Sequence, residues 1–508
     1  MINNLYYGSD NADIDRFRNA SFKFDTDVLA TFLRRIYNGF DTSNDVEPTM
    51  WREILRIINE ATVDGLVQGN YDTNIDKTFL EKLAHSNEVF SAFKVHNMGV
   101  DMAKKMRTDE GKLKPFSEWK KDIKSIASHY CGAWLQTEYN TATLRAKFAA
   151  EWKQYEADAD IMPNLRWMPT TSANPEEEHK VYWMNRLTLP VGDKFWDKHH
   201  PGDHWNCKCS LEQTDEPANP DVLSHIPDVK AQKGLAANPG KTGEMFDKEH
   251  PYIANLSKEE QAKVKAALEK QQRIDEIARS LSENIPKADR YAIAENRYEI
   301  EQILGIKQGK PMNVEEADRK NTNPNLGKGF GYMTNCIATS SGYVVREWGF
   351  DVIAAGDTPS SKIHWFSYGK KLPNGNIEEV LWHELWLNPD GSKATPASAM
   401  KWALSKYGNM NMSTKKYKEF YEENTKVPGT YIVSVEWASG GGHFTVLKRF
   451  PNGELKRIEP QTGEDIRDFD ELCRNGRKGA LHPSRGIMRV DDKIFNKEYL
   501  DIFEKPHR

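Results

Sequence analysis

The chain has 508 residues, of which 38% are hydrophobic and 29% charged, and its formal net charge at pH 7 is −5. Because this length exceeds what one ordinary hydrophobic core supports, we expect at least two domains. The slightly acidic charge offers no basic surface for nucleic acid, no apolar run is long enough for a membrane span, and the first residues lack the features of a signal peptide. We therefore expect synthesis in a cytoplasm, with neither a membrane nor a specific nucleic acid as partner.

Residues 1 to about 155 are predicted to be mostly helical. Apolar residues recur with a helical period from Asp25 to Tyr37, and similar patterns run from Trp51 to Leu66 and from Thr137 to Tyr155. In the last of these helices we expect Arg145 to face water. No residue in this region suggests chemistry, and its aromatic side chains are more typical of a core than of a cofactor site.

The region from residue 161 to 212 has a different character, rich in tryptophan, histidine and cysteine. A tryptophan-containing segment precedes a histidine, two short apolar pairs follow, and a Cys-x-Cys motif closes the region. The motifs are Leu165-Arg166-Trp167, Glu178-His179, Leu189-Pro190, Phe195-Trp196, His200-Pro201-Gly202-Asp203-His204-Trp205 and Cys207-Lys208-Cys209.

The order of these motifs resembles that of the phage Mu protein F-like minor head proteins, also called the phage head morphogenesis domain. This chain departs from the family pattern at Lys208, where arginine is usual, and at residues 200–205, which replace a double-proline turn. The resemblance covers about residues 20–250, and we assign residues 1–212 to this domain. It implies a mostly α-helical fold that is α+β at its end, and association with phage portal or capsid proteins.

The same cysteines and histidines form a candidate metal site. Thiolate and imidazole groups are suited to tetrahedral zinc, which would have a structural role here. A metal-free turn packed under tryptophans is the alternative, because Cys-x-Cys is a less specific signal than paired Cys-x-x-Cys motifs. The candidate ligands are Cys207, Cys209, His179 and either His200 or His204.

Residues 213–310 are predicted to be a linker with an extended helix. Several prolines make the first part irregular, and Ser257 to Glu260 then form a capping box that opens a long charged helix to about Ser282. Its charges alternate in sign and are typical of a solvated face. This segment would separate the first domain from a third one at residues 311–508.

Cys336 is predicted to begin a helix. It is one of five cysteines, an odd and small number that argues against a disulfide framework and for a reducing compartment. Apolar residues after Cys336 follow a helical stripe as far as Trp348, and Gly349 ends the helix. The unpaired N–H groups and positive dipole at a helix start favour a thiolate. The alternative is a small buried core residue.

Between Gly429 and Gly463 the sequence predicts two strands that are joined to a third by a turn. Apolar residues alternate from Tyr431 to Val435, and a second strand begins at His443. The turn Pro451-Asn452-Gly453 favours a three-residue hairpin loop with glycine in the left-handed conformation.

This turn predicts the register of the hairpin. With Phe450 opposite Glu454, Gln461 lies directly across from His443, and Glu459 lies diagonally across from it on the same face. A thiol needs a base that holds it as thiolate, and the imidazole needs a third group that fixes its tautomer. Cys336, His443 and Glu459 can supply these groups, and Gln461 competes with Glu459 for the third role.

Six segments resemble a papain-fold toxin family of protein glutamine deamidases. In that family the cysteine of an Asn-Cys pair is the nucleophile, the histidine of a Gly-His strand is the base, and an acidic residue in an Asp-Pro-Gln-like turn orients it. The resemblance implies these roles for Cys336, His443 and Glu459. The chain departs from the family at Ile337, where glutamine is usual, and at Glu459, where aspartate is usual. The segments are Glu316–Asp318, Asn323–Asn325, Tyr332–Cys336, Arg346–Val352, Gly442–Phe444 and Ile458–Gly463.

We therefore expect residues 311–508 to form an α+β, papain-like domain. The helix after Cys336 would pack on an antiparallel sheet, and residues 356–429 would include the substrate-facing loops. The expected strands are residues 350–355, 379–387, 430–437, 443–450 and 454–460.

The combined interpretation is a phage minor head protein that carries a cysteine-dependent effector. Cys336 would attack the side-chain amide of a glutamine in a target protein, and catalysis would need no cofactor. The toxin resemblance also implies an immunity protein. The expected location is the virion, after synthesis in a bacterial cytoplasm, with delivery into a target cell.

Other functions stay open at this point. A cysteine protease or an acyltransferase would use the same three residues with a different leaving group or acceptor. A purely structural portal- or capsid-associated protein would have lost catalysis, with Ile337 and Glu459 as signs of that loss. A nuclease is least favoured, because the carboxyl-terminal half displays no metal or acid–base groups for one.

Overall fold

The computed structural model describes residues 22–72, 76–170, 178–436, 442–462, 469–473 and 485–506. The chain divides into two compact units, Met1–Gln271 and Gln272–Arg508, which confirms the expectation of more than one domain. The division falls within helix α12 (Lys258–Ser280), whose predicted capping box is formed by Ser257 and Glu260. Residues 213–310 are thus shared between the two units, where the sequence predicts a separate linker.

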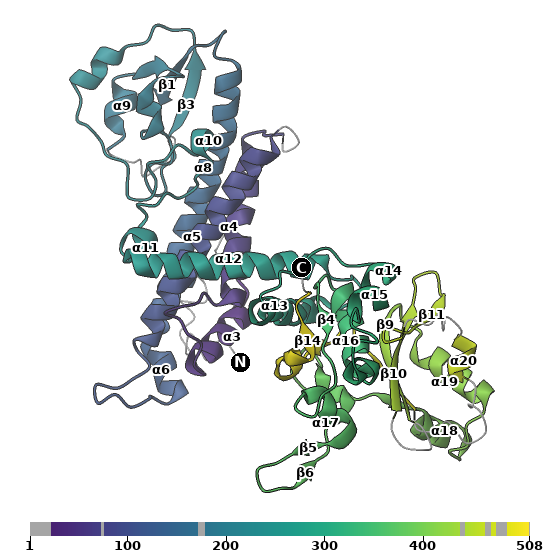
Figure 1. Cartoon of the computed structure of the whole chain (residues 1–508). Helices are drawn as coiled ribbons and strands as arrows, with labels where there is room; N and C mark the ends of the chain where they lie inside the picture. Colours follow the sequence, from purple (N-terminus) through teal and green to yellow (C-terminus); the bar gives the residue numbers. More distant parts are fainter. Residues whose placement is uncertain are drawn as a thin grey trace. The chain divides into compact units, whose positions relative to one another are not determined.

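Long helices form most of the amino-terminal unit (Figure 1). Helix α3 follows the predicted pattern, since Asp25 caps its first turn and its four apolar positions are buried. Helix α4 packs closely against α8, and a Cβ added at Gly65 would lie 2.2 Å from the carbonyl oxygen of Thr143. The described helices of this unit before α12 are α3 (Thr26–Tyr37), α4 (Pro48–Gln68), α5 (Lys77–Ala103), α6 (Phe116–Asp122), α7 (Lys124–Ser128), η1 (His129–Ala133), α8 (Trp134–Ala157), α9 (Lys180–Met184), η2 (Lys194–Asp197), η3 (Pro220–Ser224), α10 (Pro239–Thr242) and α11 (Pro251–Ala254).

The end of this unit contains a small antiparallel sheet with the strand order β2-β1-β3. Its strands are β1 (Asn164–Met168), β2 (Thr188–Pro190) and β3 (Ser210–Thr214). A separate apolar core underlies the sheet and includes Trp167, Trp196 and both cysteines of the Cys-x-Cys motif. This arrangement agrees with the expected α+β character at the end of the domain.

Arg145 corrects one expectation, because its side chain is fully buried rather than exposed to water. Its guanidinium donates to backbone carbonyl oxygens at residue 202 and within residues 235–245, two segments for which the sequence predicts no helix or strand. Such contacts replace the lost hydration of the charge, and they tie the chain after the sheet to helix α8. The acceptors are Gly202, Leu235, Ala237, Glu244 and Met245.

In the carboxyl-terminal unit, helix α16 begins at Cys336, as predicted, and the chain leaves it through Gly349, whose φ is +106°. Short helices and loops surround α16. The described helices that follow α12 are α13 (Lys287–Leu304), α14 (Val314–Ala317), α15 (Arg319–Thr322), η4 (Phe330–Met333), α16 (Cys336–Glu347), α17 (Lys362–Tyr368), η5 (Trp382–Leu385), α18 (Ala399–Tyr407), α19 (Thr414–Asn424), α20 (Phe469–Cys473) and η6 (Lys497–Ile502).

A five-stranded antiparallel sheet lies between α16 and α19 (Figure 1). Both faces are buried, so alternate residues of its strands pack against different helices. On one face Ile432 and Val446 join the core of α16, and on the other Val433 and Leu447 join that of α19. The strand order is β11 (Leu455–Ile458), β10 (Gly442–Arg449), β9 (Gly429–Glu436), β12 (Arg485–Arg489) and β8 (Ala397–Ser398).

The prediction that residues 350–355 and 379–387 form strands of the main sheet is wrong. Within residues 350–355 only β4 (Ile353–Ala354) forms, and it pairs with β14 (Phe503–Glu504) outside the main sheet. Within residues 379–387 a 3-10 helix precedes β7 (Trp386–Leu387), which pairs with β13 (Ile494–Phe495). Strands β12 and β8 take their places in the sheet. The sequence gives little sign of β12, because Gly486 weakens the strand pattern. A further hairpin pairs β5 (Lys370–Lys371) with β6 (Ile377–Glu378).

The register of β10 and β11 confirms the prediction made from the turn. Val446 pairs with Ile458 and Arg449 with Leu455, which continues the pairing of Phe450 with Glu454. Gly453 has a φ of +85°, as the three-residue turn requires. The connection between β9 and β10, at residues 437–441, lies outside the described residues.

Candidate functional site

Cys336 lies at the first position of α16, on the wall of a cleft. Its side chain is partly exposed, unlike the other four cysteines, which are buried. The N–H groups of a first helical turn have no partners within the helix, and they place partial positive charge beside the thiol. The sulfur of Cys336 can therefore reach a ligand bound in the cleft.

The imidazole of His443 connects Cys336 with Glu459. Its Nε2 atom lies 2.7 Å from Oε2 of Glu459, a carboxylate whose side chain is 2% exposed. The same imidazole interacts with Cys336, an interaction that helps to raise the pKa of His443, and both residues line the cleft. The structure therefore brings these three predicted residues together in the expected order.

The charges around His443 favour its protonated form. Burial by itself lowers the pKa of His443, but the hydrogen bonds with Cys336 and Glu459 and the charges of these two groups outweigh burial and raise the pKa to about 10. Arg457 lies 3.4 Å from the same carboxylate oxygen of Glu459 and adds positive charge behind it. An imidazolium in this position stabilises a neighbouring thiolate.

Gln461 does not orient His443, which was its alternative role in the sequence analysis. Its buried side chain lines the cleft and donates to Oδ1 of Asn335 over 3.4 Å, whereas the imidazole bonds to Glu459. Gln461 therefore contacts the residue that precedes Cys336 instead of His443. Gly463, the last residue of the segment that resembles the deamidases, lies outside the described residues.

Two buried asparagines connect the start of α16 with the turn after β11. Asn335 Nδ2 donates to the carbonyl oxygen of Ala355 at 3.0 Å, and Asn323 Nδ2 donates to those of Tyr332 and Gln461 at 3.0 and 3.1 Å. These bonds hold Cys336 and the Glu459 turn in one arrangement. Sequence reasoning assigned no role to the two amides, although both occur in the segments that resemble the deamidase family.

The cleft beside Cys336 and His443 has a volume of about 1060 Å³. Part of its wall comes from residues 357–382, within the region expected to face a substrate, while α18 and α19 pack elsewhere on the sheet. His364 lies 3.2 Å from Asp357 inside the cleft. The lining includes six aromatic and three acidic side chains: Phe330, Trp365, Phe366, Tyr368, Trp382, Phe444, Asp357, Glu379 and Glu436.

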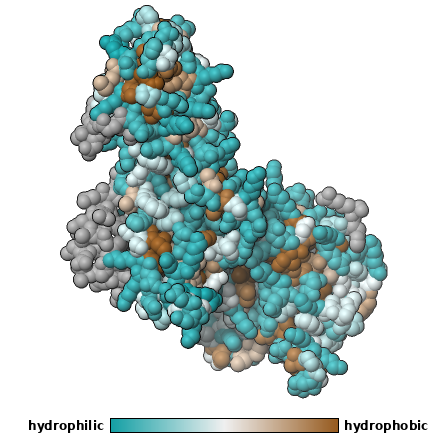
Figure 2. All heavy atoms as spheres, turned by 90° about the vertical axis from the view of Figure 1, so that its left-hand side faces the viewer, coloured by the Kyte–Doolittle hydropathy of each residue, from teal (hydrophilic) through white to brown (hydrophobic). Residues whose placement is uncertain are grey.

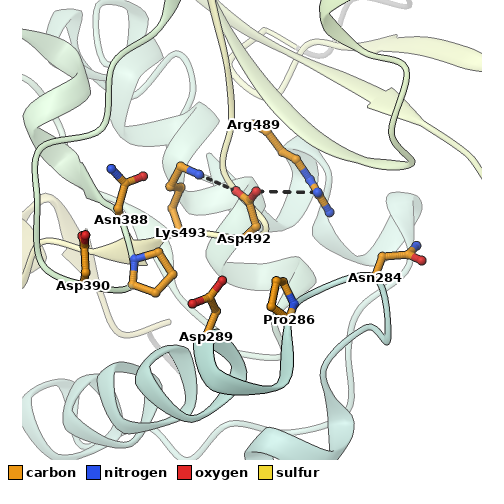
Figure 3. A pocket seen from close by; sticks show the side chains of 9 residues that line it. Asn284, Pro286, Asp289, Asn388, Asp390, Arg489, Asp492 and Lys493 are labelled. Carbon is orange, nitrogen blue, oxygen red and sulfur yellow. Dashed lines mark hydrogen bonds and ion pairs between the residues drawn. The ribbon is translucent and has the colours of Figure 1, made fainter.

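A second cavity in this unit, with a volume of about 390 Å³, lacks a comparable set (Figure 3). Its described lining contains no cysteine or histidine. Asp492, the carboxylate drawn at its centre, is paired with Lys493 and Arg489 at 2.9 and 3.6 Å. This cavity therefore has no thiol and imidazole pair like that of Cys336 and His443.

The amino-terminal unit contains the predicted cluster of possible metal ligands. Nδ1 of His179 lies 3.4 Å from Sγ of Cys207 and 3.7 Å from Sγ of Cys209. Its other nitrogen, Nε2, lies 2.9 Å from Oδ1 of Asp203. All four side chains are buried. Burial lowers the pKa of His179, but its bonds with Asp203 and Cys207 outweigh burial and raise the pKa to about 10.

The other two histidines proposed as ligands are placed differently. Nε2 of His204 lies 3.0 Å from the carbonyl oxygen of Lys230, and this histidine groups with His179 and Asp203 instead of with the thiols. His200 stacks on Phe148, and its Nδ1 lies 3.1 Å from the carbonyl oxygen of Pro201. Within the described residues, only His179 places a ring nitrogen beside both cysteines.

The surface drawn in Figure 2 is mostly hydrophilic, with hydrophobic side chains gathered in small patches. Among the described residues, none of the helices has the length and the apolar character needed to cross a lipid bilayer.

Comparison with known proteins places a family match within the amino-terminal unit. Residues 110–212 match the model of the family described as phage Mu protein F like protein. Capsid assembly protein F of Escherichia phage Mu is 29% identical over 77 residues, which are 15% of this chain and 17% of that protein. No solved structure matches the chain. The chain therefore contains a phage Mu protein F-like domain at residues 110–212.

Proposed function

We propose that this chain is a phage head-associated protein whose carboxyl-terminal unit is a cysteine-dependent amidohydrolase acting on glutamine side chains. The Mu protein F-like domain supports the first part, since its similar relative is by name a capsid assembly protein. Portal or capsid proteins would be its partners, and the virion its location. The family match ends before Cys336, so the second part depends on the site itself.

The observation that carries the enzymatic part is the convergence of Cys336, His443 and Glu459 at the wall of the large cleft. The Cys336 thiolate attacks the carbon of a glutamine side-chain amide and forms a tetrahedral intermediate. The backbone N–H of Cys336 stabilises its oxyanion, and His443 donates a proton to the departing ammonia. Water, deprotonated by His443, then hydrolyses the thioester to glutamate and frees the thiol.

The arrangement of elements supports a papain-like interpretation of this unit. The nucleophile begins a helix that packs on an antiparallel sheet, the base lies in strand β10 of that sheet, and the carboxylate directly follows the neighbouring strand β11. Glu459 takes the orienting position in place of the usual aspartate, and its extra methylene still allows the 2.7 Å contact. Ile337, the other departure from the family, is buried.

A protease or an acyltransferase would use the same three residues, and only the products distinguish them. Deamidation keeps the target chain intact and converts glutamine to glutamate, whereas proteolysis cuts the chain and acyl transfer adds a group. Mass spectrometry of the target protein, once it is identified, therefore distinguishes the three reactions. An immunity protein would bind over the cleft and block access to Cys336.

The proposal is tested by inducing the full-length chain in bacteria and comparing it with Cys336→Ala at equal soluble expression. Cys131→Ala is the matched control, because it removes a fully buried thiol from the other unit. We expect growth arrest with the wild type and the control, and no arrest with Cys336→Ala. New glutamate at a glutamine position of a host protein, in arrested cells alone, identifies the reaction. Arrest that persists in Cys336→Ala would refute the thiol mechanism.

A further inference from the structure

The cluster around His179 has the spacing of a zinc site. A tetrahedral zinc ion, with bonds of about 2.3 Å to sulfur and about 2.0 Å to nitrogen, holds these ligands about 3.5 Å apart. The distances from Nδ1 of His179 to the sulfurs of Cys207 and Cys209 are 3.4 and 3.7 Å. The three ligand atoms all lie within 4.8 Å of one another. One ion can therefore contact all three without rearrangement of the chain.

Asp203 supplies the support that a metal-binding histidine usually has. Its Oδ1 atom lies 2.9 Å from Nε2 of His179, the nitrogen directed away from the thiols. A carboxylate there favours the tautomer with the proton on Nε2, and Nδ1, which faces the two sulfurs, gives up its proton when it binds the ion. This is the tautomer that coordination requires.

A metal-free cluster explains these contacts less well. One ring nitrogen can make a directed hydrogen bond to only one of the two sulfurs at a time. Sγ of Cys207 also accepts from the backbone N–H of Cys209 at 3.5 Å, and both thiols are buried, at 2% and 3% exposure. The two cysteines do not form a disulfide with each other. A bound cation would contact both sulfurs and Nδ1 together, and would compensate the charge of the thiolates that bind it.

From this geometry we propose that the amino-terminal unit binds one zinc ion through Cys207 Sγ, Cys209 Sγ and His179 Nδ1. Asp203 is a positioning residue that orients His179. The fourth position is open to a water molecule, or to His204 if its ring, whose centre lies 4.4 Å from that of His179, turns toward the thiols. His200, a candidate from the sequence, is not a ligand.

The role of the ion is structural, because its ligands are buried and join two segments of a small core. His179 directly precedes α9, whereas the cysteines directly precede β3, the edge strand that pairs with β1. Small cores often need a metal to supply stability that their apolar contacts lack. Zinc would hold the α9 segment against the three-stranded sheet within the region that matches the Mu protein F family.

The test measures zinc in the full-length chain, purified under reducing conditions and then stripped and titrated with zinc. We expect about one zinc ion per chain. Cys207→Ser and Cys209→Ser should lose it, and Cys131→Ser, a buried thiol outside the cluster, should retain it. Titration with cobalt should produce the absorption band of a thiolate bound to the metal.

If a cysteine variant fails to fold, Asp203→Asn still tests the proposal, because it leaves all three ligands in place. Loss of the carboxylate should weaken zinc affinity about 10–100-fold in competition with a coloured chelator. His204→Gln should weaken it comparably if His204 is the fourth ligand, and leave it unchanged if water is. Fully reduced protein that takes up neither zinc nor cobalt, or Cys207→Ser protein that keeps a full equivalent, would overturn the proposal.

Discussion

The imidazole of His443, in strand β10, lies 2.7 Å from the carboxylate of Glu459, which directly follows β11. A turn at the other end of these two strands determines this contact. The three-residue turn closed by Gly453 sets the pairing of β10 with β11. A two-residue turn would shift the register by one residue and place the two side chains on opposite faces. The site thus depends on turn chemistry as well as on its own residues.

The reactivity of Cys336 should depend on His443. In His443→Ala the thiolate loses its cationic partner, so we expect alkylation of Cys336 by iodoacetamide below pH 7 to slow by roughly 10–100-fold. His364→Ala is the matched control, since it removes another histidine of the same cleft. Equal rates in the wild type and His443→Ala, measured by mass spectrometry of the Cys336 peptide, would contradict the proposed pairing.

The raised pKa of His443 predicts how stability varies with pH. Burial lowers this pKa, but the bonds with Cys336 and Glu459 raise it from 6.5 to about 10, so the folded protein holds the proton more tightly. Protonated His443 therefore stabilises the folded protein fully below pH 6.5, and this stabilisation is lost as the pH rises through about 10. The difference in urea midpoint between wild type and His443→Gln should shrink across this range.

Glu459→Gln provides the control for this pH dependence. It removes one of the causes of the raised pKa of His443, so the difference should disappear at a lower pH. A midpoint difference that does not vary with pH would show that His443 has no raised pKa in the folded protein.

The buried amide network should contribute to stability and to reactivity. Asn335→Ala leaves the carbonyl oxygen of Ala355 without its donor, and we expect a loss of about 1–3 kcal/mol in the free energy of unfolding. Alkylation of Cys336 should also slow, because the start of α16 loses its connection to Gln461. Asn374→Ala, in an exposed turn, should cost less than about 0.5 kcal/mol. Equal losses in the two variants, measured by urea unfolding, would exclude this role.

The contact between α4 and α8 predicts that Gly65→Ala destabilises the amino-terminal unit. The new Cβ would lie 2.2 Å from a backbone carbonyl oxygen, and a backbone atom within a packed helix cannot move aside easily. We expect a loss of roughly 1–3 kcal/mol, seen as a lower melting temperature. Gly192→Ala adds a Cβ that meets nothing within 4 Å and should leave the melting temperature nearly unchanged.

Several features of the fold escaped prediction because distant segments decide them. Arg145 has the spacing of a solvent-facing helical residue, yet carbonyl groups from residues 202–245 surround it. Strand β12 is short and contains Gly486, which fits because the strand passes close to Ser434 of β9. The expected strands at residues 350–355 and 379–387 have apolar residues, but their partners come from the end of the chain.

The sequence by itself determined the start of α16 at Cys336, the register of β10 with β11, and the motifs matched by the Mu protein F family. These features follow from short local patterns: a helical stripe, a turn with glycine in the left-handed conformation, and a row of closely spaced motifs. Only the tertiary structure decided that Glu459 and not Gln461 bonds to His443, and that neither His200 nor His204 joins His179 in facing both thiols. Such choices depend on how segments far apart in the chain pack together, and no local pattern records that packing.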